Sequence, residues 1–194
     1  MSFGLFKLYL SLGIDHILDI QGYDHLLFLL ALCSIFAFKD WKKLALLVTA
    51  FTIGHTLTLA ITLFGLFNIS SYLVEILIPT TIALTSLLNL RSLYKGTTKK
   101  TNIRHYWIAL LFGLIHGCGF STYLKAILGD SPEILASLFS FNLGIEIAQL
   151  LIVSMYILLV FSLSQISSKT VPVLSYSINV LAFVVAIWMI FERI

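Results

Sequence analysis

Histidine and acidic side chains stand inside or beside the long apolar stretches of this chain. His55 (FTIGHTLTL) and His116 (GLIHGCGF) each lie near the middle of such a stretch, and Asp24 and His25 (GYDHLLF) open another. Imidazole nitrogen and carboxylate oxygen are ligands that zinc, nickel, cobalt and iron accept. A charge at the bilayer centre costs about 2.5–3.5 kcal/mol on insertion scales, so such residues usually face the bundle interior and serve a function. The pattern therefore predicts a metal site within the membrane.

Further polar residues are placed where they could complete such a site. Asn142 and Glu146 (FNLGIEIAQ) are four residues apart and share one face of a helix, while Glu75 lies about one turn inside another apolar stretch. His16 and Asp19 share a face of the segment before the first stretch. We expect the principal metal ligands to be His25, His55, His116, Asp24 and Glu146, with His16, Glu75 and Asn142 as weaker candidates.

A structural explanation competes with this one. A single histidine inside a membrane span more often bonds to a neighbouring helix than binds a metal, but three of them with two acids in one small chain favour the metal. Small residues let helices approach closely, and Gly54, Gly113 and Gly117 flank two of the histidines. The expected cofactor or cargo is a divalent transition metal, namely nickel, cobalt or zinc.

The elements that must position these side chains are membrane helices. The chain has 194 residues, of which 59% are hydrophobic and 11% charged, against about 25% charged in a soluble domain. A helix needs roughly 20 apolar residues to cross a bilayer. We expect an all-α, polytopic bundle forming a single transmembrane domain over 1–194. Its six spans lie near 22–38, 43–66, 71–94, 105–128, 133–163 and 171–191, after an amphipathic helix within 1–20 that is interfacial or dips in beside the bundle.

The basic residues predict an orientation for an integral protein of a bacterial inner membrane. Three of the twelve, Lys7, Lys125 and Arg193, fall on one side of the expected bundle. The other nine lie in or beside the connections on the opposite side: Lys39, Lys42, Lys43, Arg91, Lys95, Lys99, Lys100, Arg104 and Lys169. The positive-inside rule puts those nine in the cytoplasm and both termini outside.

Four motifs in order resemble one known family. Residues 13–32 (GIDHILDIQGYDHLLFLLAL), followed by FTIGHTLTL, GLIHGCGF and FNLGIEIAQ, are similar to the HupE/UreJ family of membrane proteins. That family accompanies hydrogenase and urease genes and is regarded as nickel or cobalt permeases. The resemblance implies that His16, Asp24 and His25 correspond to the family's first metal motif and His116 to a later one. It also implies metalloenzyme-maturation proteins as partners, beside the metal ion and the lipid bilayer, and no nucleic acid.

Two functions of different class fit these residues. In a permease, Asp15, His16 and Asp19 would capture a nickel- or cobalt-type ion outside, and Asp24 and His25 would pass it to His55, His116 and Glu146. In an intramembrane metalloenzyme, the metal would activate water toward a lipid, lipoprotein or peptide, with Glu146 or Glu75 as general base. A third hypothesis is a structural accessory subunit in which the core histidines are hydrogen-bonded to neighbouring helices. A polar passage to the cytoplasm favours the permease, whereas a closed floor beneath the metal and a lateral opening favour the enzyme.

Overall fold

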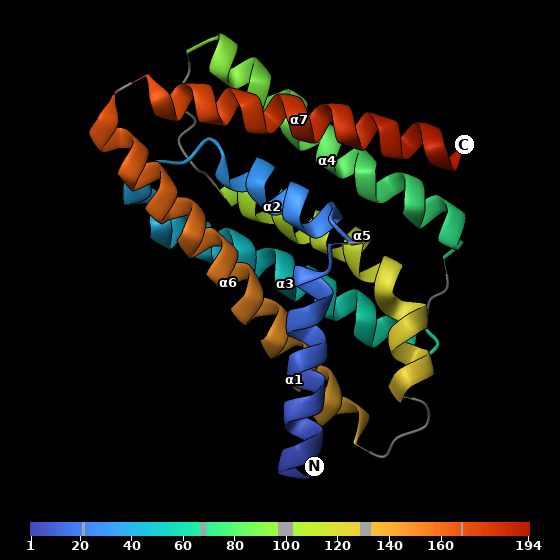
Figure 1. Ribbon diagram of the computed structural model, residues 1–194. Coiled ribbons are helices and arrows are strands. Elements are labelled where there is room, and N and C mark those ends of the chain that lie inside the picture. The colour runs from blue at the N-terminus through green and yellow to red at the C-terminus, as the bar shows by residue number, and fades with distance from the viewer. Residues whose placement is uncertain (21, 67–68, 97–102, 129–132, 168) are drawn as a thin grey trace.

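The computed structural model describes residues 1–20, 22–66, 69–96, 103–128, 133–167 and 169–194. Every regular element in that part of the chain is helical, which confirms the expected all-α bundle (Figure 1). The seven α-helices are α1 (Phe3–Leu18), α2 (Asp24–Cys33), α3 (Trp41–Leu63), α4 (Ser71–Tyr94), α5 (Ile103–Leu128), α6 (Ile134–Ile166) and α7 (Thr170–Arg193), with a 3-10 turn, η1 (Phe38–Asp40), before α3.

Five helices, α3 to α7, are long and apolar enough to cross a bilayer. They contain between 23 and 33 residues, so each is at least about 35 Å long at 1.5 Å per residue. Their ends lie within a few residues of the expected spans 43–66 through 171–191. Large apolar side chains such as Leu46, Leu88 and Leu158 remain exposed along them, as expected where lipid covers the outer surface.

The first expected span is different, because it consists of two shorter helices. α2 has only ten residues, about 15 Å, and is too short to cross a bilayer alone. The helix before it, α1, does not lie apart from the bundle but packs along α6. The backbone leaves the helical conformation at Asp19, and Asp24 opens α2, where a carboxylate suits the positive end of the helix dipole. The break falls inside the bundle, near the centre of Figure 1.

Glycines allow the helices that carry the candidate ligands to touch backbone to backbone. A Cβ added at Gly113 of α5 would overlap the carbonyl oxygen of Phe51 on α3, and one at Gly117 would meet that of His55. A Cβ at Gly13 of α1 would overlap the carbonyl oxygen of Phe141 on α6 in the same way. The glycine pattern predicted the close approach beside His55 and His116, but not the one at Gly13 that positions the helix carrying His16.

The two ends of the bundle differ in charge. The C-terminal ends of α2, α4 and α6 and the N-terminal ends of α3, α5 and α7 lie at one end, whereas both termini lie at the other (Figure 1). We call the first the basic end, because its described residues include Lys39, Lys42, Lys43, Arg91, Lys95, Arg104 and Lys169. Lys99 and Lys100 lie outside the described residues. The second is called the terminal end.

Candidate metal centre

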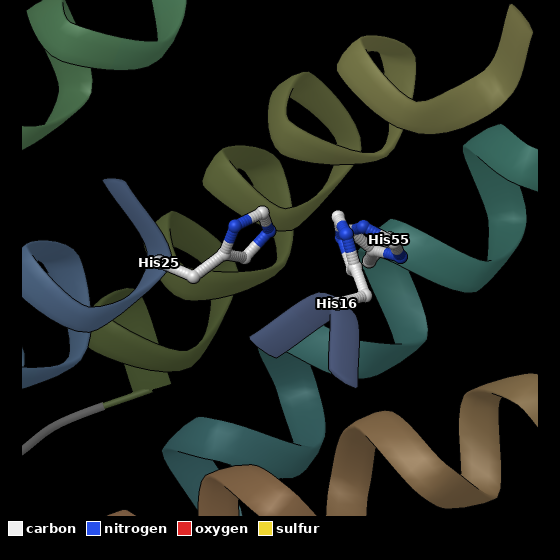
Figure 2. A group of neighbouring side chains, drawn as sticks. All are labelled: His16, His25 and His55. Carbon is white, nitrogen blue, oxygen red and sulfur yellow. The ribbon is translucent and has the colours of Figure 1, made fainter. Parts of the chain in front are cut away.

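Three imidazoles from three different helices converge at the break between α1 and α2. His16 lies in the last turn of α1, His25 in the first turn of α2, and His55 in the second half of α3. One ring nitrogen from each can be chosen so that all three lie within 4.8 Å of one another. Figure 2 shows the three rings turned toward a common space. This separation suits a shared metal ion after a small inward movement, since zinc–nitrogen bonds are about 2.0–2.1 Å long.

His116 of α5 stands next to this group as a fourth imidazole. Its ring centroid lies 5.2 Å from that of His25, and its side chain is 1% exposed. It does not belong to the three residues that meet the mutual distance. Four-coordinate metal sites take four donors, or three donors and one exchangeable position. His116 is therefore placed to supply or to border the fourth position.

Buried ring nitrogens of all four histidines have no hydrogen-bond partner. The unpartnered atoms are His16 Nε2, His25 Nε2, His116 Nδ1, and both Nδ1 and Nε2 of His55. A buried polar atom without a partner costs about 1–3 kcal/mol, and most such atoms in folded proteins are paired. A neutral imidazole has one nitrogen lone pair, so a bound cation would use one nitrogen of each histidine, and the donor set fits a transition metal. Histidines that served only to join helices would instead be bonded to neighbouring helices.

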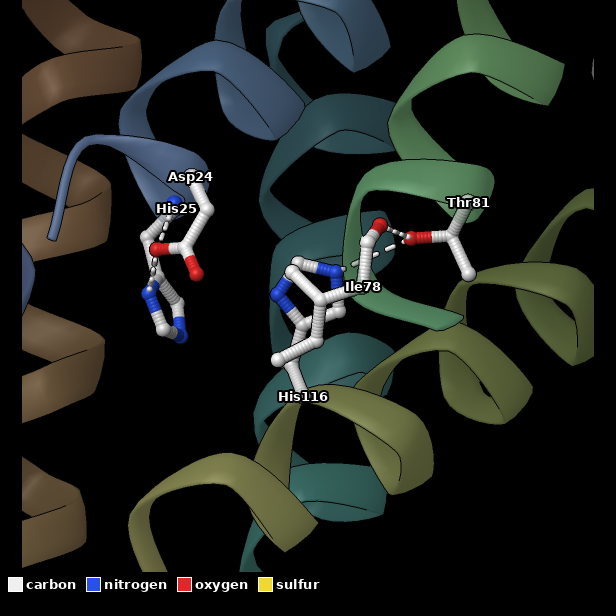
Figure 3. A network of polar contacts seen from close by, with 5 residues as sticks. All are labelled: Asp24, His25, Ile78, Thr81 and His116. Carbon is white, nitrogen blue, oxygen red and sulfur yellow. Dashed lines mark hydrogen bonds and ion pairs between the residues drawn. The ribbon is translucent and has the colours of Figure 1, made fainter. Parts of the chain in front are cut away.

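The partner of His25 determines which of its nitrogens is available. Asp24 Oδ1 lies 2.9 Å from His25 Nδ1 and also accepts from the His25 backbone N–H at 2.8 Å (Figure 3). A carboxylate can only accept, so Nδ1 carries the proton and Nε2 keeps its lone pair. Asp24 thus orients the candidate ligand His25 in the way that carboxylates orient metal-bound histidines elsewhere.

A threonine performs the same task for His116. The Thr81 hydroxyl on α4 donates to the carbonyl oxygen of Ile78 at 2.7 Å, and its oxygen lies 3.0 Å from His116 Nε2 (Figure 3). Because that hydroxyl proton is used, Nε2–H must donate to Thr81, which leaves the lone pair on Nδ1. Nothing in the sequence pointed to Thr81, because its role depends on how α4 packs against α5.

Two of the expected ligands, Glu146 and Asn142, bond to threonines of α3 instead. Both oxygens of Glu146 contact threonine hydroxyls of α3, from Thr49 and Thr52. Asn142 bonds to Thr56 at 2.7 Å. Neither belongs to the histidine group, whereas Glu75 lines the cavity in front of it. His16, ranked lower from the sequence, is one of the three converging residues.

A cavity of about 360 Å³ connects the histidines with the terminal end of the bundle. His16, His25 and His116 line its inner part, and Glu75, Ser71 and Arg193 line its outer part. A second, wider cavity of about 780 Å³ reaches His16 between α1 and α5, past Asp15 and Asp19. The candidate site is therefore approached from the terminal end, through openings that carry acidic side chains.

Aromatic side chains close the other side. Phe28, Phe51 and Phe112 each lie about one turn nearer the basic end than a histidine on the same helix. The rings of Phe28 and Phe51 stack with centroids 4.9 Å apart, and Phe112 lies 6.0 Å from Phe28. We call these three residues the aromatic floor. It separates the histidines from the basic end of α2, α3 and α5.

Asp24→Asn is expected to weaken metal binding about 10- to 100-fold without abolishing it, the usual effect of removing a residue that orients a ligand. The amide can turn its NH₂ toward His25 and so no longer holds Nδ1 protonated. Calorimetric titration of the purified protein with Ni²⁺ or Co²⁺ measures the change. Asp40→Asn, at the exposed basic end, is the matched control, and wild-type affinity in Asp24→Asn would contradict the role given to Asp24.

Comparison with known proteins gives one match. The profile of the HupE / UreJ protein family matches residues 2–193, nearly the whole chain. No curated protein and no solved structure matches. The match covers all seven helices and therefore every candidate ligand described above.

Proposed function

The chain belongs to the HupE/UreJ family. Because this family is associated with nickel and cobalt uptake, we propose that the protein is a permease for a divalent transition-metal ion of the nickel or cobalt type. The ion is the transported substrate and binds transiently to His16, His25 and His55, with His116 at the fourth position. The observation that carries this proposal is the set of unpartnered imidazole nitrogens that face one another inside a membrane bundle.

The route into the site supports uptake from the terminal end. With the basic end in the cytoplasm, as the positive-inside rule favours, the cavities lined by Asp15, Asp19 and Glu75 open to the outside. Acidic side chains at these openings attract a divalent cation and raise its local concentration. Neutral imidazoles then replace part of its water shell.

The break between α1 and α2 supports transport rather than permanent binding. Discontinuous helices near the midplane hold the substrates of many transporters, and movement of one part against another opens the site to alternate sides. Here two of the four imidazoles lie at the ends of the broken helix, so a shift of α1 or α2 would separate ligands. In the observed conformation the aromatic floor closes the site toward the basic end, and the site is open to the terminal end.

An intramembrane metalloenzyme is the second candidate, and two observations favour it. The aromatic floor closes the site toward the basic end, and an apolar cavity of about 480 Å³ between α3, α4 and α5 adjoins it at Cys118. That cavity suits an acyl chain or an apolar peptide. Glu75 would then be the general base, because it lines the metal cavity, whereas Glu146 is bonded to threonines.

Metal uptake into liposomes separates the two functions. Vesicles containing the purified protein and a metal-sensitive dye should accumulate Ni²⁺ or Co²⁺ at a saturable rate, and His25→Ala should reduce that rate at least about 10-fold because a ligand is lost. His105→Ala, the histidine remote from the cluster, should transport normally. Stoichiometric metal that remains bound through purification, without uptake into vesicles, would contradict the permease and favour the enzyme.

A further inference from the structure

A second polar cluster lies between α3 and α6, apart from the histidines. Glu146 Oε1 contacts the Thr49 hydroxyl at 2.6 Å, and Glu146 Oε2 contacts the Thr52 hydroxyl. The Thr52 hydroxyl also lies 2.8 Å from Gln149 Oε1. Thr49 and Thr52 precede His55 on α3, so this cluster lies on the basic side of the histidine level. It is thus on the far side of the candidate metal site from the outer cavities.

The number of protons in this cluster depends on the state of Glu146. Thr52 has one hydroxyl proton, yet its oxygen contacts both Glu146 Oε2 and Gln149 Oε1, which are acceptors when the carboxylate is ionised. If Thr52 donates to Gln149, the contact with Glu146 needs a proton on the carboxyl group. In that case Glu146 donates to Thr52, whereas a Thr52 hydroxyl that donates to Glu146 corresponds to the ionised carboxylate.

The ionised state can be satisfied as well, by a half-turn of one amide. Gln149 is fully buried, and its Nε2 has no partner in the observed arrangement. Turning the amide lets Nε2 donate to the Thr52 oxygen, and Thr52 then donates to an ionised Glu146. Thr49 can donate to the carboxylate in both states. The cluster thus provides hydrogen bonds for Glu146 with and without its proton.

The spacing of the oxygens favours a proton over a metal ion. A hard cation such as Ca²⁺ lies 2.3–2.6 Å from each ligand oxygen. Oxygens in direct contact at 2.6–2.8 Å, as in this cluster, share a hydrogen instead. A metal ion would have to push Thr49 and Thr52 away from the carboxyl group.

No charged side chain neutralises Glu146 among the residues the structure describes. Its hydrogen bonds go to threonines, and no ion pair involves it. The titratable groups nearest in sequence to Glu146 are Glu133 and Tyr156, and those nearest to its partners Thr49 and Thr52 on α3 are Lys43 and His55. The titratable groups on the other helices packed against α6 include His16, Asp24, His25 and Tyr176. None of them contacts Glu146. An ionised carboxylate without a cation is costly inside a membrane bundle, so a proton is its natural partner.

We propose that Glu146, with Thr49, Thr52 and Gln149, is a proton-binding site that couples proton movement to metal transport. The carboxylate takes one proton from water in one conformation of the bundle and returns it in another, so no other reactant is consumed. Thr56, which bonds to the Thr52 carbonyl at 2.7 Å and adjoins His55, links the cluster to the metal level. The coupling rests on the proposed permease function, whereas the proton site does not.

Infrared difference spectroscopy tests the proton site directly. The wild-type protein should show the carbonyl stretch of a protonated carboxylic acid that disappears on raising the pH, and Glu146→Gln should lack it. Glu192→Gln, exposed near the end of α7, should keep it. Thr52→Val, which removes a donor to the ionised form, should make the band persist to higher pH. A band that Glu146→Gln leaves unchanged would overturn the proposal.

Proton movement in metal-loaded vesicles tests the coupling. Glu146→Gln should bind Ni²⁺ with wild-type affinity, but its proton movement per metal ion, read from a pH dye inside the vesicles, should fall at least about 10-fold. Wild-type proton movement in this variant would refute coupling, and loss of metal binding would make Glu146 a metal ligand instead. If the wild-type protein moves no metal, the permease function fails and the infrared result alone decides whether Glu146 holds a proton.

Discussion

Replacing His55 with alanine is expected to abolish high-affinity metal binding while the protein stays folded. His55 is fully buried, lies in the group of three converging imidazoles, and has no hydrogen bond at either ring nitrogen. Its removal therefore breaks no bond in the metal-free protein but takes away a ligand. We expect the affinity for Ni²⁺ or Co²⁺ to fall by on the order of 100-fold or more, beyond the loss caused by changing a residue that only orients a ligand.

Elemental analysis and thermal unfolding together measure this result. A ligand present at 100 times its dissociation constant adds about 2.7 kcal/mol to the stability of the folded state. Added Ni²⁺ should therefore raise the melting temperature of the wild-type protein and of His105→Ala, but not that of His55→Ala. An equal metal-induced shift in His55→Ala would show that the metal binds elsewhere.

Gly113→Ala is expected to destabilise the protein and to damage the metal site at the same time. The new Cβ would overlap the carbonyl oxygen of Phe51, which cannot move without displacing α3. Overpacking of this kind typically costs about 1–3 kcal/mol and occasionally more. The crossing lies within one turn of both His55 and His116, so separating α3 from α5 also separates two imidazoles.

Gly4→Ala on α1 is the matched control. A Cβ at Gly4 would have ordinary contact, 3.9 Å from Ser2 Oγ. Because alanine favours helix over glycine by up to about 1 kcal/mol, this variant should be as stable as the wild type or slightly more so. Unfolding in detergent followed by circular dichroism, and Ni²⁺ titration, give the two readouts. Equal stability and affinity of Gly113→Ala and Gly4→Ala would contradict the close crossing.

Most of the fold could be predicted from the sequence, and one part could not. The spans that correspond to α3–α7 are long, continuous apolar stretches, and hydropathy measures them residue by residue. The stretch at 22–38 looked like a span for the same reason, but the helix there ends at Cys33. The segment before it was expected to lie at the interface or to dip in beside the bundle. Its packing along α6 depends on Gly13 meeting a partner more than a hundred residues away.

The candidate site shows the same division. His25, His55 and His116 could be recognised from the sequence because imidazoles are uncommon within apolar membrane spans. His16 seemed part of a wet outer segment, yet the path of α1 brings its ring 4.7 Å from that of His25. Glu146 seemed equally placed for the metal, but it faces threonines of α3. A helical register says which residues share a face, and not which neighbour that face meets.

The sequence alone determined that the protein lies in a lipid bilayer, that it is helical, and which residues carry the chemistry. These properties follow from the free energy of transfer of each side chain into lipid, which depends on the side chain itself and not on its tertiary neighbours. Only the tertiary structure decided which of those residues meet. The break between α1 and α2 and the glycine crossings of α3 with α5 and of α1 with α6 bring four imidazoles together and leave Glu146 in a separate cluster. Ligand convergence depends on distances of a few ångströms between helices, which are set by packing across the whole bundle.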